Sequence, residues 1–356
     1  MPSKYWSDFV QGLDPYVPGE QPKQQDLIKL NTNENPYPPS PKVVEVLTQD
    51  AVKLLRLYPD PSNSLLKTAI ANYYNMDLGN VSVGNGSDEI LAFAFQAFFK
   101  QRLPILFPDI TYGFYTVYCG LFDIDYTQIP LADDFSIKLS DYQRENGGVI
   151  FANPNAPTGI GKSLQSIEVL LQSNTESVVI VDEAYVDFGA ESAASLVGRY
   201  PNLLVVQTLS KSRSLAGSRV GFALGSTVLI EALEKVKNSF NPYSVDRLAE
   251  AAAVAAIDDV AYFEQCCAKI IKTRQWVSEQ LESLGFEVLP SQANFVLIRP
   301  TSISASELFE QLRQHNIVVR FFKKPRIDAY IRVTIGSDNE MIALVDALKE
   351  ILLQRR

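Results

Sequence analysis

The sequence predicts an α/β protein with a mostly parallel sheet flanked by helices in a large domain, followed by a smaller α+β domain. Between residues 41 and 240, short apolar runs alternate with stretches that carry apolar residues at helical spacing. This alternation is typical of a parallel sheet covered by helices. Beyond it, an alanine-rich helical stretch ends at Gly285 and leads into short strand and helix patterns. The strand candidates of the large domain are residues 81–83, 104–107, 149–152, 178–182, 203–207 and 221–224.

The chain divides into three segments by pattern. Residues 1–40 contain repeated prolines and no lasting period, so we expect an extended arm that lies over another part of the molecule. Residues 41–245 carry the alternating pattern and would form the large domain, and residues 246–356 would form the small one. A length of 356 residues is sufficient for two hydrophobic cores.

Composition and charge exclude several classes of function. Apolar residues make up 46% of the chain and charged residues 21%, as in an ordinary globular protein. The net charge of −9 and the lack of a Lys/Arg run argue against nucleic acid as a partner. No apolar stretch suits a membrane span, and no signal peptide opens the chain, so we expect a cytoplasmic protein. Three cysteines give no disulfide framework, and a single histidine excludes sites that need two, so no metal centre is expected.

A candidate phosphate site follows the first predicted strand. Ligands of open α/β sheets bind outside the carboxyl ends of the strands. The segment GNGSDE, residues 84–89, opens a helix there, and Gly86, Ser87 and Asp88 would offer backbone N–H groups to an anion. A capped turn between strand and helix is the structural alternative. The segment is not the dinucleotide fingerprint, because Glu89 stands at the third glycine position.

Later strand ends add a carboxylate, a lysine and an aromatic ring. Asp182 ends the apolar run VVIVD, where an unpaired carboxylate would be costly. Lys211 follows the run LLVVQ, with Ser210 before it and Arg219 eight residues on, and Tyr112 follows another strand. Pyridoxal 5′-phosphate requires all of these groups, because it has an aldehyde for a lysine imine, a ring nitrogen, a flat ring and a phosphate. A nearby cation would also lower the pKa of the lysine and so favour its nucleophilic form.

The lysine stretch SKSRSLAGSRVG resembles the lysine motif SKxxxLAGxRxG of the fold-type-I, pyridoxal-phosphate-dependent aminotransferases. Among these, the chain is similar to the histidinol-phosphate aminotransferase family. The resemblance covers residues 14 to 337 in family order and implies the fold-type-I aminotransferase fold. The other motifs that carry it are PYVPGEQP, KLNTNENPYPPSP, RLYPDP, GNGSDE, PDITYGFY, NPNAPTG, VDEAYVDF and IRVTIGS.

The resemblance implies roles for the cofactor site. Lys211 would form the Schiff base and then carry the proton between substrate and cofactor carbons. Asp182 would pair with the ring nitrogen, Tyr185 would donate a hydrogen bond to the phenolic oxygen, and Tyr112 would stack on the ring. Tyr58 of RLYPDP would reach the phosphate of the neighbouring subunit, so a homodimer is implied. The phosphate would also be held by Gly86, Ser87, Asp88, Ser210 and Arg219.

One position departs from the family pattern. The residue directly before Pro-Thr-Gly is usually an asparagine that donates to the phenolic oxygen of the cofactor, and here it is Ala156. Asn155, one position earlier, would take over this hydrogen bond, or Tyr185 would act with less help. Neither alternative removes a catalytic proton carrier.

The resemblance also implies how anionic substrates are held. Arg332, in the pattern IRVTIG, matches the arginine that binds the α-carboxylate of substrates in the wider family. Histidinol phosphate carries a phosphate ester there, so its phosphate should lie near Arg332, with Arg320 as a second cation; a surface charge is the structural alternative for Arg320. Glutamate and 2-oxoglutarate would use the same two arginines. Tyr16 and the segment 31–35, including Asn35, resemble the lid over the substrate.

The expected activity is transamination of histidinol phosphate with 2-oxoglutarate, giving imidazole-acetol phosphate and glutamate in histidine biosynthesis. Two alternatives keep the cofactor: an aromatic amino acid aminotransferase, and threonine-phosphate decarboxylase, whose substrate is also a phosphorylated amine. A non-enzymatic regulator would need an added DNA-binding domain, for which the chain offers no basic helix.

Overall fold

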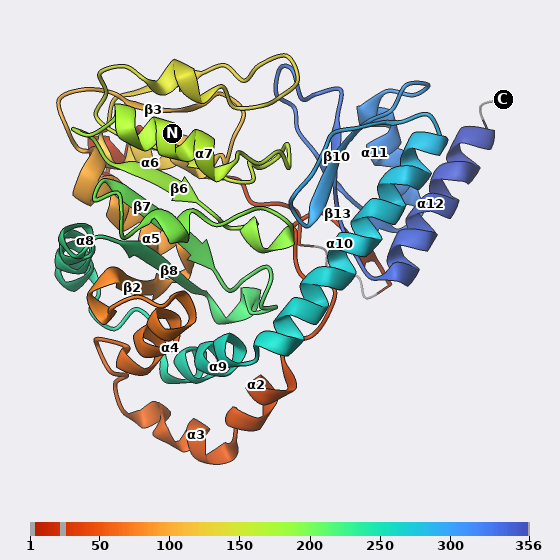
Figure 1. The fold of residues 1–356 in the computed structure, drawn as a ribbon. Helices are drawn as coiled ribbons and strands as arrows, with labels where there is room; N and C mark the ends of the chain where they lie inside the picture. Colours follow the sequence, from red (N-terminus) through yellow and green to blue (C-terminus); the bar gives the residue numbers. More distant parts are fainter. Residues whose placement is uncertain (1–3, 22–25, 355–356) are drawn as a thin grey trace.

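The computed structural model describes residues 4–21 and 26–354. Its large domain contains a seven-stranded sheet (Figure 1). In order across the sheet, its strands are β2 (Val81–Asn85), β8 (Val220–Gly225), β7 (Leu203–Thr208), β6 (Val179–Asp182), β5 (Val149–Ala152), β3 (Ile105–Pro108) and β4 (Tyr126–Ile129). β8 runs antiparallel to both of its neighbours, and all other neighbouring pairs are parallel. The sheet is therefore mostly parallel, as the sequence predicts.

Helices cover both faces of this sheet. In β6, Val179 and Val181 belong to one hydrophobic core, while Ile180 belongs to the core on the opposite face. Because both faces are covered, every residue of β5, β6 and β7 is buried, which explains their continuous apolar runs. The helices are α4 (Ser64–Tyr74), α7 (Leu164–Ser173) and α9 (Arg247–Asp258) on one face, and α5 (Gly86–Ala94), α6 (Phe114–Phe122) and α8 (Thr227–Phe240) on the other.

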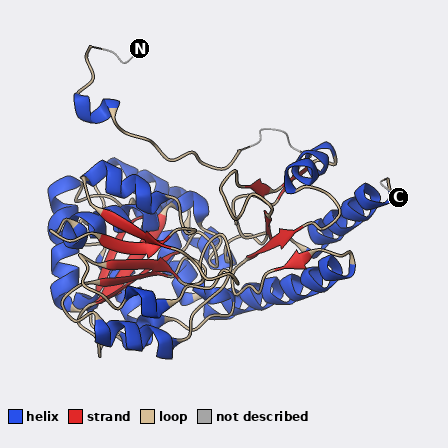
Figure 2. Cartoon of the chain, turned by 90° about the horizontal axis from the view of Figure 1, so that it is seen from above, coloured by secondary structure: helices blue, strands red, loops and turns tan. Residues whose placement is uncertain are grey.

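The smaller domain has its own sheet (Figure 2). It also has its own hydrophobic core. Neighbouring strands of this sheet are antiparallel. A capping box between Ser337 and Glu340 starts the last helix. The strands in order are β12 (Arg320–Phe321), β13 (Ile331–Thr334), β10 (Phe295–Arg299) and β9 (Glu287–Val288), and the helices are α10 (Val260–Ser283), α11 (Ala305–Gln314) and α12 (Asp338–Leu353).

The N-terminal arm joins the small domain and then crosses to the large one. β1 (Ile28–Lys29) pairs in parallel with β11 (Ile317–Val318), and Leu30 is buried in the core of the small domain. The next residues pass the carboxyl edge of the large sheet, where Asn35 donates to the backbone carbonyl of Lys211. The remaining helices of this end of the chain are α1 (Asp8–Gln11), α2 (Pro41–Val46) and α3 (Gln49–Lys53).

The predicted fold class is confirmed, and the structure differs from the prediction in some details, among them the short strand β1 in the arm. The sequence does not predict β4, because this edge strand carries three exposed residues and no apolar run. The predicted boundary between residues 245 and 246 lies before α9, whose alanines pack in the core of the large domain, whereas α10 packs in that of the small domain. The packing partner therefore changes at Asp259, between these helices. Among the described residues, none of the helices combines the length and apolar character that crossing a membrane requires.

Candidate active site

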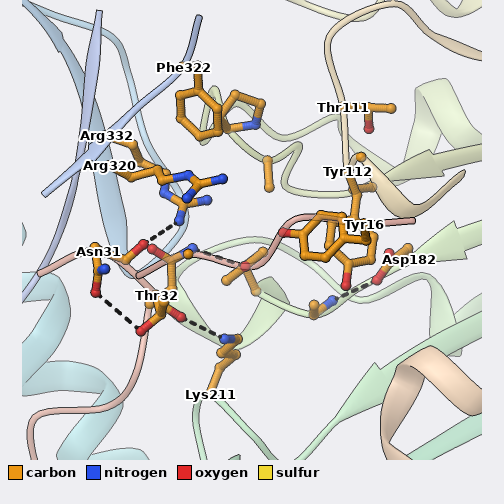
Figure 3. Close-up of a pocket in the computed structure, with 18 of the residues that line it drawn as sticks. Tyr16, Asn31, Thr32, Thr111, Tyr112, Asp182, Lys211, Arg320, Phe322 and Arg332 are labelled. Atoms are coloured by element: carbon orange, nitrogen blue, oxygen red, sulfur yellow. Dashed lines mark hydrogen bonds between the residues drawn. The ribbon is translucent and has the colours of Figure 1, made fainter. Parts of the chain in front are cut away.

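A cavity of about 440 Å³ lies where the carboxyl edge of the large sheet meets the small domain and the arm (Figure 3). Its position agrees with the expected place of a ligand in an open α/β sheet. All three segments of the chain line it. The predicted site residues that line it are Tyr16, Ser87, Asp88, Tyr112, Asp182, Tyr185, Ser210, Lys211, Arg219, Arg320 and Arg332.

Lys211 stands in the turn after β7, and its ammonium group is poorly solvated. Nζ donates a hydrogen bond to the backbone carbonyl of Thr32 in the arm, at 3.1 Å. Burial, followed by the charge of Arg332, lowers the pKa of Lys211 to about 8. At pH 7 about a tenth of the amine is therefore neutral, and this is the form that attacks a carbonyl carbon.

Asp182 ends β6 with its carboxylate facing the cavity. It is 4% exposed and accepts hydrogen bonds from the Tyr115 hydroxyl at 2.7 Å and from the Ala184 N–H at 3.3 Å. Burial raises the pKa of Asp182 to about 6. Within residues 4–21 and 26–354, no lysine, arginine or histidine forms an ion pair with it. A buried carboxylate open to the cavity fits a cationic ring nitrogen as its missing partner.

An anion cradle forms at the start of α5. Gly86 has a left-handed backbone with φ of 79°, and a Cβ there would stand 2.6 Å from Nη2 of Arg219, so the glycine makes room for the guanidinium. Asp88 holds this guanidinium in place through an ion pair of 2.9 Å. Ser87 at the helix N-terminus, Ser210 and Arg219 all face the cavity. A helix N-terminus with a cation and hydroxyl groups suits a phosphate.

Two tyrosines line the cavity, of which Tyr112 is bonded to the cradle and Tyr185 lies near Lys211. The Tyr112 hydroxyl donates to Asp88 Oδ1 at 2.8 Å, which fixes its ring against the cavity. The Tyr185 hydroxyl accepts from Asn33 Nδ2 at 3.0 Å, and its ring lies 5.9 Å from Lys211 Nζ. These groups, the cradle and Asp182 together fit pyridoxal 5′-phosphate in shape and in charge.

The small domain supplies a pair of arginines. Arg320 of β12 and Arg332 of β13 are partners in the sheet register, so both side chains point to the same side. The ring of Phe322 lies beside both guanidinium groups, with its centroid 5.5 Å from Cζ of Arg320 and 5.6 Å from Cζ of Arg332 (Figure 3). Arg332 donates to the Asn31 carbonyl at 2.8 Å, while its buried Nε has no hydrogen-bond partner among the described residues. This pair can bind a phosphate or a carboxylate.

Four predicted site residues are not among those that line the cavity: Gly86, which makes room for Arg219, and Asn155, Asn35 and Tyr58. Asn155 is fully buried, and its amide is used by the Ile110 carbonyl at 2.9 Å and by Thr111 Oγ1 at 2.8 Å, so the structure corrects its assignment as a cofactor ligand. Asn35 donates to the backbone carbonyls of Lys211 and Ser212 and so holds the lysine turn from outside the cavity. Tyr58 is 77% exposed and stacks on a tyrosine outside the cavity, so its role toward a second subunit stays a prediction.

The structure adds residues that the sequence does not single out. Tyr115 donates to Asp182, the Thr32 carbonyl accepts from Lys211, and Phe322 supports the two arginines. Tyr115, in the first turn of α6, follows Tyr112 by three residues, and this spacing is the one signal that marks it. A backbone acceptor such as Thr32 has no signal in the sequence.

Comparisons with known proteins agree with this geometry. The chain matches the family described as "Aminotransferase class I and II" over residues 25–348. It is 60% identical over 350 residues to "Histidinol-phosphate aminotransferase 1" of Hydrogenovibrio crunogenus, which covers 98% of each chain. The crystal structure of histidinol-phosphate aminotransferase from Sinorhizobium meliloti in complex with pyridoxal-5'-phosphate has a TM-score of 0.89 at 26% identity, covering 100% of this chain and 99% of that one. The chain therefore belongs to the class I and II aminotransferases and, within them, to the histidinol-phosphate aminotransferase family.

Proposed function

We propose that this protein transfers the amino group of histidinol phosphate to 2-oxoglutarate with pyridoxal 5′-phosphate, forming imidazole-acetol phosphate and glutamate in histidine biosynthesis. The observation that carries the proposal is one cavity that holds a buried lysine with a pKa of about 8, an unpaired carboxylate and two arginines. Relatives of that name at 58 to 60% identity support the choice of substrate.

Different residues of the cavity would have different roles in the reaction. The cofactor, when bound, supplies an electrophilic carbon and a protonated ring that withdraws electrons. Lys211 Nζ would hold the proton that leaves the amine-bearing carbon of the substrate, because its lowered pKa leaves it able to accept one. Asp182 would keep the ring nitrogen protonated, and Tyr112 would orient the ring. The Ser87, Ser210 and Arg219 cradle would fix the phosphate of the cofactor.

Both substrates would use the same anion site. Arg320 and Arg332 would bind the phosphate of histidinol phosphate in one half-reaction and the carboxylates of 2-oxoglutarate in the other. Because both molecules need this site, they would bind in turn, with the amino group stored on the cofactor between them. Tyr16, which faces the cavity from the arm, would shield the site from water.

A homodimer completes the proposal. Tyr58 lies on an exposed apolar surface, and large exposed apolar patches mark interaction sites. In a symmetric dimer this surface would face its own copy and bring Tyr58 to the partner's phosphate cradle. Other exposed apolar residues of this surface are Val52, Leu54, Leu55 and Leu57. The cytoplasm would be the site of action.

A single half-reaction tests the activity. Protein loaded with pyridoxal phosphate receives histidinol phosphate without a keto acid, and the visible absorption of the cofactor is followed. Loss of the band with one equivalent of ketone and no carbon dioxide is expected, and Lys211→Ala should show none of this. Carbon dioxide release with threonine phosphate alone would indicate a decarboxylase. A response to phenylalanine alone would indicate an aromatic aminotransferase.

Mixed dimers test the shared site. Lys211→Ala and Tyr58→Ala subunits are each expected to be poorly active, and random mixing should restore about a quarter of wild-type activity, because half of the dimers then hold one intact site. If Tyr58 acted within its own chain, no mixed dimer would hold an intact site and activity would stay low.

A further inference from the structure

Tyr115 touches two residues of the cofactor site without lining the cavity itself. It lies fully buried in α6, and its hydroxyl donates to Asp182 Oδ2 at 2.7 Å. Its ring packs edge-on against the ring of Tyr112, with centroids 5.7 Å apart and an interplanar angle of 89°. One side chain thus supports both the carboxylate proposed to hold the ring nitrogen and the aromatic ring proposed to stack on the cofactor.

The hydroxyl of Tyr115 opposes the effect of burial on Asp182. Burial raises the pKa of Asp182, whereas this hydrogen bond and the weaker one from the Ala184 N–H lower it. Burial and Asp182 itself hold the pKa of Tyr115 well above its usual range, so the phenol remains a donor at every working pH. The other titratable groups around the carboxylate are Asp88 on α5, Tyr118 on α6 and Tyr185 after β6, and Asp88 raises the pKa of Asp182.

A carboxylate that receives a hydrogen bond is a weaker base. A less basic Asp182 leaves the shared proton on the ring nitrogen, where a positive charge is needed, and does not take it up. The ring packing of Tyr115 contributes independently, since it limits the directions in which Tyr112 can move. Substitution by phenylalanine removes the first effect and keeps the second.

We propose that Tyr115 is a positioning residue whose hydroxyl keeps Asp182 ionised and aimed at the ring nitrogen of the cofactor. The inference rests on the proposed role of Asp182. It predicts that Tyr115→Phe leaves the fold and cofactor loading intact but shifts the proton from the ring nitrogen toward the carboxylate. The half-reaction with histidinol phosphate should slow by about tenfold, the size expected for one hydrogen bond to a charged group.

Pyridoxal phosphate labelled with ¹⁵N at the ring nitrogen provides a direct test, because the NMR chemical shift of this nitrogen reports whether it is protonated. In the wild-type holoenzyme we expect the signal of a protonated nitrogen, in Asp182→Asn that of an unprotonated one, and in Tyr115→Phe an intermediate position. Wild-type position in Tyr115→Phe together with a shift in Asp182→Asn would overturn the role of Tyr115 alone. No shift in Asp182→Asn would overturn the proposed role of Asp182.

Unfolding of the cofactor-free full chain gives a second readout. The folded-state pKa of Asp182 lies above its unfolded value, so the folded protein binds more protons and its stability falls as pH rises toward the folded pKa of about 6. Tyr115→Phe should raise the folded-state pKa of Asp182 further. The free energy of unfolding that this variant loses relative to wild type should therefore be larger at pH 8 than at pH 5. Tyr118→Phe is the matched control, since its hydroxyl donates to the Asp88 backbone carbonyl at 2.8 Å. Equal pH dependence in the two variants would mean that Tyr115 is only structural.

Discussion

Asp182 and Glu183 are adjacent buried carboxylates at the end of β6, yet their surroundings differ. Asp182 faces the cavity and accepts two hydrogen bonds, of which one is long at 3.3 Å. Glu183 is 2% exposed and accepts three: from Ser192 Oγ and the Ala193 N–H, both at 2.6 Å, and from Gln207 Nε2 at 2.8 Å. Successive side chains of a strand point to opposite faces, which separates the two carboxylates. The carboxylate with unused acceptor capacity marks the site, and the fully bonded one holds the fold.

The comparison predicts its largest effect for Asp182→Asn. The amide is nearly the same size and can still accept the Tyr115 hydrogen bond, so the fold should persist. Because a neutral amide cannot hold a charged ring nitrogen, turnover should fall by roughly 10³-fold or more. Steady-state kinetics and circular dichroism on the purified holoenzyme check both statements. Normal turnover in this variant would show that Asp182, like Glu183, is not needed for the chemistry.

Glu183→Gln should have a smaller effect, and on stability instead of chemistry. The new amide NH₂ would meet groups that already donate, so the free energy of unfolding should drop by about 1–3 kcal/mol. Turnover per folded molecule should stay within about twofold of wild type, since Glu183 does not line the cavity. Denaturant unfolding and active-site titration separate the two quantities. A large loss of turnover by fully folded protein would contradict this assignment.

The stability cost of Glu183→Gln should also depend on pH. Burial raises the pKa of Glu183 from 4.5 to about 7, so the folded state binds more protons than the unfolded state and wild-type stability falls as pH rises through this interval. The glutamine variant lacks this slope. Its deficit relative to wild type should therefore shrink between pH 5 and pH 8, and a deficit that grows with pH would mean that the folded protein favours the ionised form.

The same contrast explains what the sequence can predict. Asp182, Lys211 and the cradle at Ser87 follow buried strands, and strand topology alone brings such positions to one edge of the sheet. The apolar run VVIVD singles out Asp182 as the carboxylate at the strand end, but it does not show that Ser192, Ala193 and Gln207 hydrogen-bond the neighbouring Glu183. The sequence predicts that Asn155 contacts the cofactor, whereas its side-chain amide donates to the Ile110 carbonyl and accepts from Thr111. This contact could not be predicted because the loop that holds Thr111 is 44 residues away in the sequence. Contacts between distant side chains carry no local signal.

Tyr74→Phe should have the smallest effect, because Tyr74 contacts Glu183 only through Gln207. The Tyr74 hydroxyl donates to Gln207 Oε1 at 2.6 Å, and the same amide donates to Glu183. Its removal should cost about 1 kcal/mol of unfolding free energy and leave the half-reaction unchanged. Tyr142→Phe is the control, because the buried Tyr142 hydroxyl has no hydrogen-bond partner within the described part of the chain, and it should be neutral. If Tyr74→Phe slowed the half-reaction while Tyr142→Phe did not, the network behind Glu183 would reach Asp182 through the strand, and the two carboxylates would have to be treated as one coupled unit.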